Sequence, residues 1–590
     1  MHDRSAIGKV GLLIFCWVLS FAAMSLSLTE TGYFSFWMRV FVPVMLIFGY
    51  LFLWKIPRVF CRWQLWAAAV FFAAVVTLGA SFDHTGSIEL ITGQKWKALV
   101  YFLGRVPAFY MGMALVWEAM KNGKLWIKPC PVWAYAAVIF LCWLPYLVTV
   151  WPGTVSNDSI TQLTEIYGSK PLSNGNPLLQ TGLIWLCAVI GQGIFRSADT
   201  AVALYVLSQG LLMAWLLGVT VSMMIRGGAP KWLSLLALGF YAICPIFPLF
   251  AFCVGKDTNF AMATLWLSLI IWRMVSNEKP TRRETIFLSV SAVLCVLLRN
   301  AGAGLVAVTL AALLIWSLVR RNQIWRSVLY ALTCTAAALF ILYAALIPAL
   351  SAEDSPETEM LSVPLQQVAR VVTNEALPEE YADTVNAVLP VDQLKAAYNG
   401  QLSDPVKDLW NADATAAEKR DFFKAWASLA AQFPETYFSA FFHNSYGYVM
   451  PGFVSKIKPT FLLGAEDDTD ELTGKFDFTV NPNAERMKIV LKRLLTYAPF
   501  RILAAPGLYG WIALFGLAVV LAARKWRLLL YMLPALLTLA GCFFSPVNGY
   551  FRYAMPIYFA APVLLYAAAQ AIRNTERSTE YEATDRAALL

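Results

Sequence analysis

Apolar stretches long enough to cross a lipid bilayer recur along this chain, and they restrict its fold more than any other feature. A spanning helix needs about 20 predominantly apolar residues. Hydrophobic residues make up 59% of the chain and charged residues only 14%, which agrees with a membrane protein. We therefore predict an all-α polytopic membrane protein with about 14 transmembrane helices. The predicted spans are 8–27, 38–55, 65–81, 97–119, 131–150, 200–225, 232–252, 258–274, 285–299, 301–319, 327–349, 506–523, 527–544 and 553–572.

One further apolar stretch, 178–195, is ambiguous, and the basic loops decide its interpretation. If the N-terminus is cytoplasmic, the basic loops at 55–62 and 121–128 lie inside and Asp158 lies outside. Short cytoplasmic loops are enriched in Lys and Arg, and the later basic loops return to the cytoplasm only if 178–195 does not cross. We therefore predict that 178–195 lies along the interface or re-enters, and that both termini are cytoplasmic. The net charge of +9 then reflects topology, and we expect no nucleic-acid partner.

A long polar segment before the last three spans has a different charge balance. Residues 350–493 carry 22 Asp and Glu against 13 Lys and Arg, whereas the whole chain carries 37 against 46. This asymmetry predicts an exported domain. Apolar residues at helical spacing in 420–447, with helix-start signals at PETY and NPNAER, predict that it is mainly helical. The predicted organisation is an N-terminal four-span extension (1–130), a membrane core (131–349), an extracytoplasmic domain (350–505), three final spans (506–572) and a cytoplasmic tail (573–590).

The segment WPGTVSNDSITQL places a carboxylate, Asp158, directly after the span that ends at Val150. A Pro152-Gly153 turn leads from the span into polar residues. A carboxylate at the membrane boundary can act as a general base toward a hydroxyl group. Asp is also a preferred helix N-cap, and both interpretations stand at this point. Asn157 is a supporting candidate.

Three basic side chains share the predicted outer face with Asp158. Lys256 opens a helix and offers a point charge to a phosphate, while Arg299 and Arg552 offer bidentate donors. The plain alternatives are an interfacial ion pair for Lys256 and snorkelling for the two arginines. Together the three cations suit a phosphate or a diphosphate. The polar neighbours that we expect to support them are Asp257, Asn300 and Tyr553.

Metal, nucleotide and disulfide chemistry have little support. His443 is one of three His residues, and a lone His among aromatic residues is usually structural, so it is a weaker supporting candidate. The ten Cys lie in or beside apolar spans, which argues against disulfides and thiolate metal sites. The chain has no P-loop, which argues against a nucleotide-driven pump. The acidic run 466–470 is interpreted as a solvated loop. We predict no cofactor, and nothing indicates a divalent cation.

The order of these motifs over residues 131–572 resembles the GT-C superfamily of integral-membrane glycosyltransferases. The resemblance rests on WPGTVSNDSITQ in the first outer loop of the core, NPLLQTGLIWL in the interfacial helix, VGKDT in a charged outer turn and FRYAMP at the last span. A similar PG-x-x-x-x-DS-x-x-Q element occurs in uncharacterised bacterial membrane proteins. Many of those carry His-Pro where this chain has Asn176-Pro177, so a role carried over to that position is in doubt.

The resemblance implies an inverting transfer on the outer face of a bacterial cell membrane. The donor would be a polyprenyl-phosphate sugar, and the acceptor a cell-envelope glycan, lipid or protein. Asp158 would be the base, and Lys256, Arg299 and Arg552 would bind the donor phosphate. Two alternatives stay open: a polysaccharide polymerase or ligase that uses a lipid-diphosphate glycan, and a transporter or flippase. Transporters usually place polar groups near the bilayer midplane, whereas these charges gather at the outer boundary.

Overall fold

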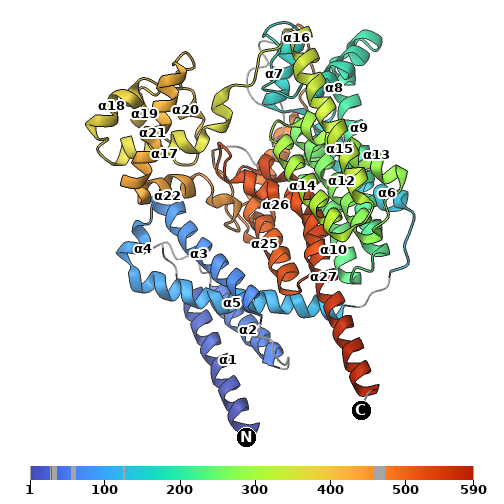
Figure 1. The fold of residues 1–590 in the computed structure, drawn as a ribbon, viewed down its shortest axis with the longest axis vertical. Coiled ribbons are helices and arrows are strands. Elements are labelled where there is room, and N and C mark those ends of the chain that lie inside the picture. The colour runs from blue at the N-terminus through green and yellow to red at the C-terminus, as the bar shows by residue number, and fades with distance from the viewer. Residues whose placement is uncertain are drawn as a thin grey trace.

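The structure is a computed structural model that describes residues 2–26, 28, 36–54, 62–123, 127–457, 472 and 474–588. Figure 1 shows a large helical bundle, with a smaller helical unit beside it that contains α17 to α22. Within the described residues, eight helices are long and apolar enough to cross a membrane. The chain is therefore a helical membrane protein. Thirteen of the fourteen predicted spans correspond, over their described residues, to one helical segment each, and the number that cross the membrane stays a prediction beyond these eight.

The N-terminal helices form one group that packs on the rest of the bundle through α3 and α5. Phe72 of α3 stacks on Trp511 of α25, with ring centroids 4.2 Å apart. The first turns of α2 and α3 carry no Asp or Glu, and the last turn of α2 carries no Lys or Arg, as expected for segments in contact with lipid. The helices of this group are α1 (His2–Ser25), α2 (Phe36–Trp54), α3 (Trp63–Thr85), α4 (Glu89–Gly93) and α5 (Lys95–Asn122).

The central part of the bundle runs from α6 to α16 and contains one pair of very short strands. Its membrane-crossing candidates are α6, α9, α12, α14 and the α15–α16 unit. Its helices are α6 (Val132–Val150), α7 (Asn157–Ile166), α8 (Leu178–Ala188), α9 (Ala198–Arg226), α10 (Lys231–Ile243), α11 (Ile246–Ala251), α12 (Lys256–Asn277), α13 (Arg282–Leu298), α14 (Gly302–Arg320), α15 (Ile324–Ile341) and α16 (Ile347–Ala349). Two π-helical turns, η1 (Val189–Ile194) and η2 (Leu342–Leu346), and the strands β1 (Thr154–Val155) and β2 (Cys253–Val254) complete it.

The predicted span at 232–252 is wrong as one continuous helix. α10 ends at Ile243, and Cys244 has an extended backbone with ψ 121°. The residue before a proline is disfavoured in the α conformation, and Pro245 follows Cys244. The apolar composition suggested a single span, whereas the proline divides it into α10 and the short α11.

The segment from β1 to the end of η1 begins and ends at the same end of the bundle. Gly153, just after α6, packs against Val202 and Val206 near the start of α9. Gly218, near the end of α9, packs against Ala136 at the start of α6. α6 and α9 are therefore antiparallel neighbours, and 178–195 returns the chain to the side it left. This is the arrangement expected for a segment that does not cross. Gly153 also has φ 150°, and a Cβ there would come within 2.9 Å of both valines.

The helical unit between α16 and α23 has its own hydrophobic core, which includes Leu365, Val385, Leu394 and Phe422. The predicted helix starts are confirmed: α22 begins at Pro434, and the Asn481 side chain caps α23. The acidic run 466–470 lies outside the described residues. The helical turns here are η3 (Glu357–Met360) and η4 (Tyr446–Tyr448), and the helices are α17 (Ser362–Asn374), α18 (Glu379–Asn386), α19 (Val391–Ala397), α20 (Asp404–Lys407), α21 (Ala416–Gln432) and α22 (Pro434–His443).

The C-terminal helices return to the bundle, where α27 is the most deeply packed candidate span. Of the apolar window in Phe551–Thr575, 89% is buried inside the protein. Figure 1 shows the start of α1 and the end of α27 on the same side of the molecule, away from α7 and α8. The elements are α23 (Pro482–Leu494), α24 (Ala498–Ala504), α25 (Pro506–Ala522), η6 (Trp526–Leu528), α26 (Leu529–Cys542) and α27 (Phe551–Ala588).

Candidate functional site

The candidate site is organised by the β1–β2 pair. The two strands are parallel, with Thr154 opposite Cys253 and Val155 opposite Val254. Each strand leads directly into a helix, β1 into α7 and β2 into α12. Parallel pairing therefore places the N-termini of both helices next to each other, and the first turn of each carries a carboxylate. The Ser159 hydroxyl strengthens this junction by donating to the Val254 carbonyl at 3.0 Å.

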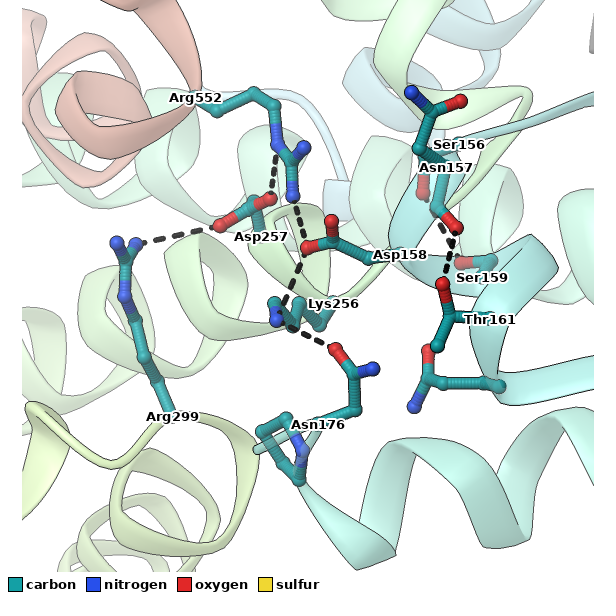
Figure 2. Close-up of polar contacts among 12 residues, drawn as sticks. Ser156, Asn157, Asp158, Ser159, Thr161, Asn176, Lys256, Asp257, Arg299 and Arg552 are labelled. Atoms are coloured by element: carbon teal, nitrogen blue, oxygen red, sulfur yellow. Dashed lines mark hydrogen bonds and ion pairs between the residues drawn. The ribbon is translucent and has the colours of Figure 1, made fainter. Parts of the chain in front are cut away.

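Asp158 lies in the first turn of α7 but does not cap it. The N-cap residue is Ser156, and no side chain accepts a hydrogen bond there. Instead, the Asp158 carboxylate forms ion pairs with Lys256 Nζ at 3.0 Å and Arg552 Nη2 at 2.5 Å. The N-cap interpretation of Asp158 is thus wrong, and the carboxylate faces two cations from distant parts of the chain (Figure 2).

Asp257, in the first turn of α12, is held by both predicted arginines. Its Oδ1 accepts from Arg299 Nη1 at 3.3 Å, and its Oδ2 accepts from Arg552 Nε at 2.6 Å. Arg552 therefore bridges the two carboxylates, as Figure 2 shows. We call the five side chains Asp158, Lys256, Asp257, Arg299 and Arg552 the ion cluster. It brings together the predicted base and all three predicted phosphate ligands.

The ion cluster is partly accessible and carries excess positive charge. The Asp158 side chain is 29% exposed, whereas that of Asp257 is 6% exposed. Three cations face two carboxylates, which leaves one unbalanced positive charge. Burial alone would raise the pKa of Asp158, but Arg552 and Lys256 outweigh it and hold that pKa well below its ordinary value. Asp158 is therefore ionised at neutral pH.

Arg552 is positioned by the loop that joins α26 to α27, and this loop is anchored to the smaller helical unit. Asn548 accepts from the Gly447 N–H at 2.8 Å and donates its own N–H to the Gln401 carbonyl at 2.9 Å. The Tyr448 hydroxyl donates to the Val547 carbonyl at 2.8 Å. The segment 399–450 therefore fixes the start of α27, and with it the guanidinium of the ion cluster.

The supporting candidates lie at different distances from the ions. The Tyr553 ring stacks near Arg299, whose Cζ is 5.0 Å from the ring centroid. Asn300 donates to the Asn174 carbonyl at 3.3 Å and so holds the α13–α14 turn against the 167–177 loop. Asn157 is exposed, and Figure 2 shows its side chain directed away from the ions. Of Tyr553, Asn300 and Asn157, only the Tyr553 side chain contacts a member of the ion cluster among the described residues.

His443 belongs to a different set of contacts. Its Nδ1 lies 3.4 Å from Arg370 Nη1, and its ring packs near Phe82 of α3 and Tyr446. Burial, and secondarily the Arg370 charge, lower the pKa of His443 to about 4. The imidazole is therefore neutral at pH 7. Its neighbours indicate that it joins the smaller helical unit to the N-terminal helices.

Two functional candidates were not among the predicted site residues. Asn176 Oδ1 accepts from Lys256 Nζ at 2.8 Å, so the amide orients the lysine toward Asp158. Glu165 is buried, and its Oε2 has no hydrogen-bond partner among the described residues. Burial raises the pKa of Glu165, and contacts with the Ser173 backbone and the Asn176 side chain offset only part of that rise. The sequence offered no signal for Glu165, because its turn of α7 also carries the polar residues Gln162 and Thr164 and its burial appears only in the fold.

The described part of the chain contains no group of three or more His, Cys, Asp or Glu that could hold a metal ion. The ion cluster itself has two carboxylates, but each already contacts cationic side chains. Chemically, the arrangement suits an anion that competes with these carboxylates for the cations.

A family model matches residues 167–583, and its description is DUF6020, a family of unknown function. The chain belongs to the DUF6020 family. No curated protein and no solved structure matches it. The DUF6020 match includes Asn176, Lys256, Asp257, Arg299 and Arg552, and it begins after Asp158. The family carries no assigned activity, so the chemistry has to be argued from the site.

Proposed function

We propose that the chain is an inverting membrane glycosyltransferase with a GT-C-like core that uses a polyprenyl-phosphate sugar donor. The acceptor is a cell-envelope glycan, lipid or protein on the outer face. One observation carries the proposal: three cations from separate parts of the chain meet two carboxylates at two adjacent helix N-termini. Both termini and the basic loops are assigned to the cytoplasm in this proposal, and the smaller helical unit to the outside.

The ion cluster is suited to a lipid-linked phosphate for two physical reasons. The free N–H groups and dipole of a helix N-terminus favour anions, and α7 and α12 both begin here. Arg552 and Lys256 both contact Asp158, so a phosphate that displaces this carboxylate gains two charge-assisted partners at once. The lipid tail then lies along the bundle while the head group stays at its end.

In the proposed reaction the acceptor hydroxyl attacks the anomeric carbon of the donor sugar. The hydroxyl proton moves to the Asp158 carboxylate as the new C–O bond forms. The bond between the anomeric carbon and the phosphate oxygen breaks, and its electron pair stays on the phosphate. The leaving phosphate gains negative charge, which Lys256, Arg299 and Arg552 stabilise. Fixed charges act strongly on such developing charge because they need no reorganisation.

Donor binding would also prepare the base. With Lys256 and Arg552 on both sides, Asp158 is a weak base because its pKa is held low. When a phosphate shares these cations, their stabilisation of the carboxylate falls and the pKa of Asp158 rises toward its ordinary value. The same contact that binds the donor would therefore strengthen the base. Asp257 is more deeply buried and keeps both arginines in place.

Binding of polyprenyl phosphate to the purified protein tests the donor site without knowledge of the sugar. We expect polyprenyl phosphate to bind and the matching polyprenol, which lacks the phosphate, to bind at least tenfold more weakly, because one to two charge-assisted contacts are lost. Lys256→Ala should remove most of this preference. Equal binding of the two lipids would contradict the phosphate site.

Transfer activity tests the role of Asp158. With radiolabelled polyprenyl-phosphate sugars, we expect Asp158→Asn to lose at least 100-fold in rate, since general bases typically contribute 10² to 10⁴. Asp413→Asn, the same change at an exposed position of the smaller helical unit, is the control. Substantial activity in Asp158→Asn would remove its role as base. Transfer only from lipid-diphosphate glycans would favour a polymerase or ligase, and donor movement without product would favour a flippase.

A further inference from the structure

A second polar cavity lies at the end of the bundle opposite the ion cluster. Its volume is about 510 Å³, and it lies between the C-terminal turn of α9 and the lower part of α27. The two helices leave the membrane here, because Arg226 is the last residue of α9 and the apolar stretch of α27 ends at Thr575. We call this cavity the basic pocket; its polar lining residues are Arg226, Tyr566, Gln570, Arg573 and Asn574.

The basic pocket differs in charge from an ordinary surface depression. Two of its lining residues are arginines, and none of the described residues that line it is Asp or Glu. Arg226 is exposed and makes no hydrogen bond or ion pair with any described residue. The other walls are apolar, formed by residues such as Ile127, Pro129 and Ile225. Cationic and apolar surfaces therefore meet in one cavity at the membrane boundary.

Hydrogen bonds also fix the walls of the basic pocket. Arg573 donates to the carbonyls of Met120, Gly123 and Gly228, which closes the ends of α5 and α9 around α27. The Gln570 amide donates to the Tyr566 hydroxyl at 2.8 Å, and that hydroxyl donates to the Gly227 carbonyl. These contacts hold the wall in one geometry, while the Arg226 guanidinium stays available.

We propose that the basic pocket binds a phosphate-bearing group at the membrane surface, with Arg226 as its main cationic ligand. Basic pockets between helix ends at a membrane surface attract phosphate head groups. A cavity of this size falls in the range of small-ligand sites and exceeds the needs of a bare phosphate. The phosphate can come from an anionic lipid or from a soluble phosphate, and both sources offer the same chemistry to Arg226. This site is independent of the proposed glycosyl transfer.

Lipid binding to the full-length protein in detergent tests the proposal. Phosphatidylglycerol, phosphatidylcholine and inorganic phosphate are titrated in turn, and binding is measured by native mass spectrometry for the lipids and by calorimetry for phosphate. We expect Arg226→Gln to weaken phosphatidylglycerol binding about fivefold, the effect of about one basic residue near a membrane surface. Arg320→Gln is the matched control, because Arg320 is also an exposed arginine in the last turn of a candidate span at this end.

The outcomes separate the two sources of phosphate. If the parent protein prefers phosphatidylglycerol, and Arg226→Gln loses this preference while Arg320→Gln keeps it, the site is supported with a lipid as its ligand. Inorganic phosphate binding with the same dependence on Arg226, and without a lipid preference, supports the site with a soluble ligand. If the two variants do not differ from each other with any of the three probes, the proposal is overturned. Arg226 has no partner among the described residues and Arg320 is exposed, so both variants should unfold at the temperature of the parent protein.

Discussion

The ion cluster and the basic pocket lie at opposite ends of one bundle and use arginine in opposite ways. In the ion cluster every cation is paired with a carboxylate, and Arg552 is paired with two. In the basic pocket Arg573 is bound to backbone carbonyls and Arg226 has no partner among the described residues. The ion cluster therefore holds its cations in place through carboxylates before an anion binds. The basic pocket leaves the Arg226 guanidinium without a carboxylate partner among the described residues.

The difference has consequences for stability and for binding. Removing one partner of a buried ion pair leaves an uncompensated charge, which is strongly destabilising. Removing an unpaired surface arginine costs little, because no contact is lost. An anion that enters the ion cluster must compete with carboxylates, so binding there is selective for strong acceptors. An anion that enters the basic pocket competes only with water.

The largest expected effect comes from Arg552→Ala. The substitution removes two charge-assisted hydrogen bonds, one to Asp158 and one to Asp257, so we expect a loss of about 3–5 kcal/mol in the free energy of unfolding. Arg226→Ala should change it by less than about 0.5 kcal/mol. Chemical denaturation in detergent measures both. Equal stability of the two variants would show that the bridging arginine is not buried among its partners, and the contrast between the sites would disappear.

The second prediction uses Arg370, a cation that pairs with no carboxylate among the described residues and instead faces His443. The folded-state pKa of His443 is about 4, below its ordinary value of 6.5, so the unfolded chain binds more protons between these values. Stability is therefore full above pH 6.5 and falls as the pH drops toward 4. We expect the parent protein to lose about 2 kcal/mol more than His443→Gln across this window.

The exposed His84 supplies the comparison for this measurement. His84→Gln, the same change at an exposed position, should keep the pH dependence of the parent protein. Thermal unfolding at a series of pH values gives both slopes. Identical slopes for His443→Gln and His84→Gln would mean that His443 is protonated freely in the folded protein.

The smallest expected effect concerns the neutral ligand of the ion cluster. Asn176→Ala removes the acceptor that orients Lys256, and a neutral amide contact of this kind contributes about 1 kcal/mol. The affinity for polyprenyl phosphate should fall about threefold in parallel. Asn157→Ala, in which an exposed amide is removed, should leave stability within about 0.5 kcal/mol of the parent protein. A larger loss in Asn157→Ala than in Asn176→Ala would contradict the assignment of Asn176.

Much of the helical framework could be predicted because length and hydropathy determine it. The spans at 200–225 and 258–274 lie within α9 and α12, and the helix starts at PETY and NPNAER were recognised from capping chemistry. The break at Cys244 was missed because the apolar composition continues through it. The two-residue strands β1 and β2 were also missed, since they are too short to show a period of two.

The sequence indicated which residues belong to the ion cluster, but it did not indicate which of them form ion pairs. Polar residues at the predicted outer ends of spans pointed to Asp158, Lys256 and Arg552 individually. Asp158 and Arg552 are separated by 394 positions, and no local pattern indicates that one guanidinium bridges two carboxylates. His443 was only a weaker supporting candidate, because a lone His among aromatic residues is usually structural, and tertiary packing places it against Arg370 and α3.

The position of Arg552 in the sequence also determines the order in which the charges of the ion cluster are synthesised. Asp158 and Asp257 precede Arg552 by 394 and 295 positions, so a nascent chain presents both carboxylates long before α27 is made. Until then Lys256 and Arg299 can balance them one for one, and this corner of the bundle is electrically neutral. Insertion of the final helix adds the excess positive charge. Under the proposed function, attraction of the donor phosphate therefore depends on the last helix of the chain.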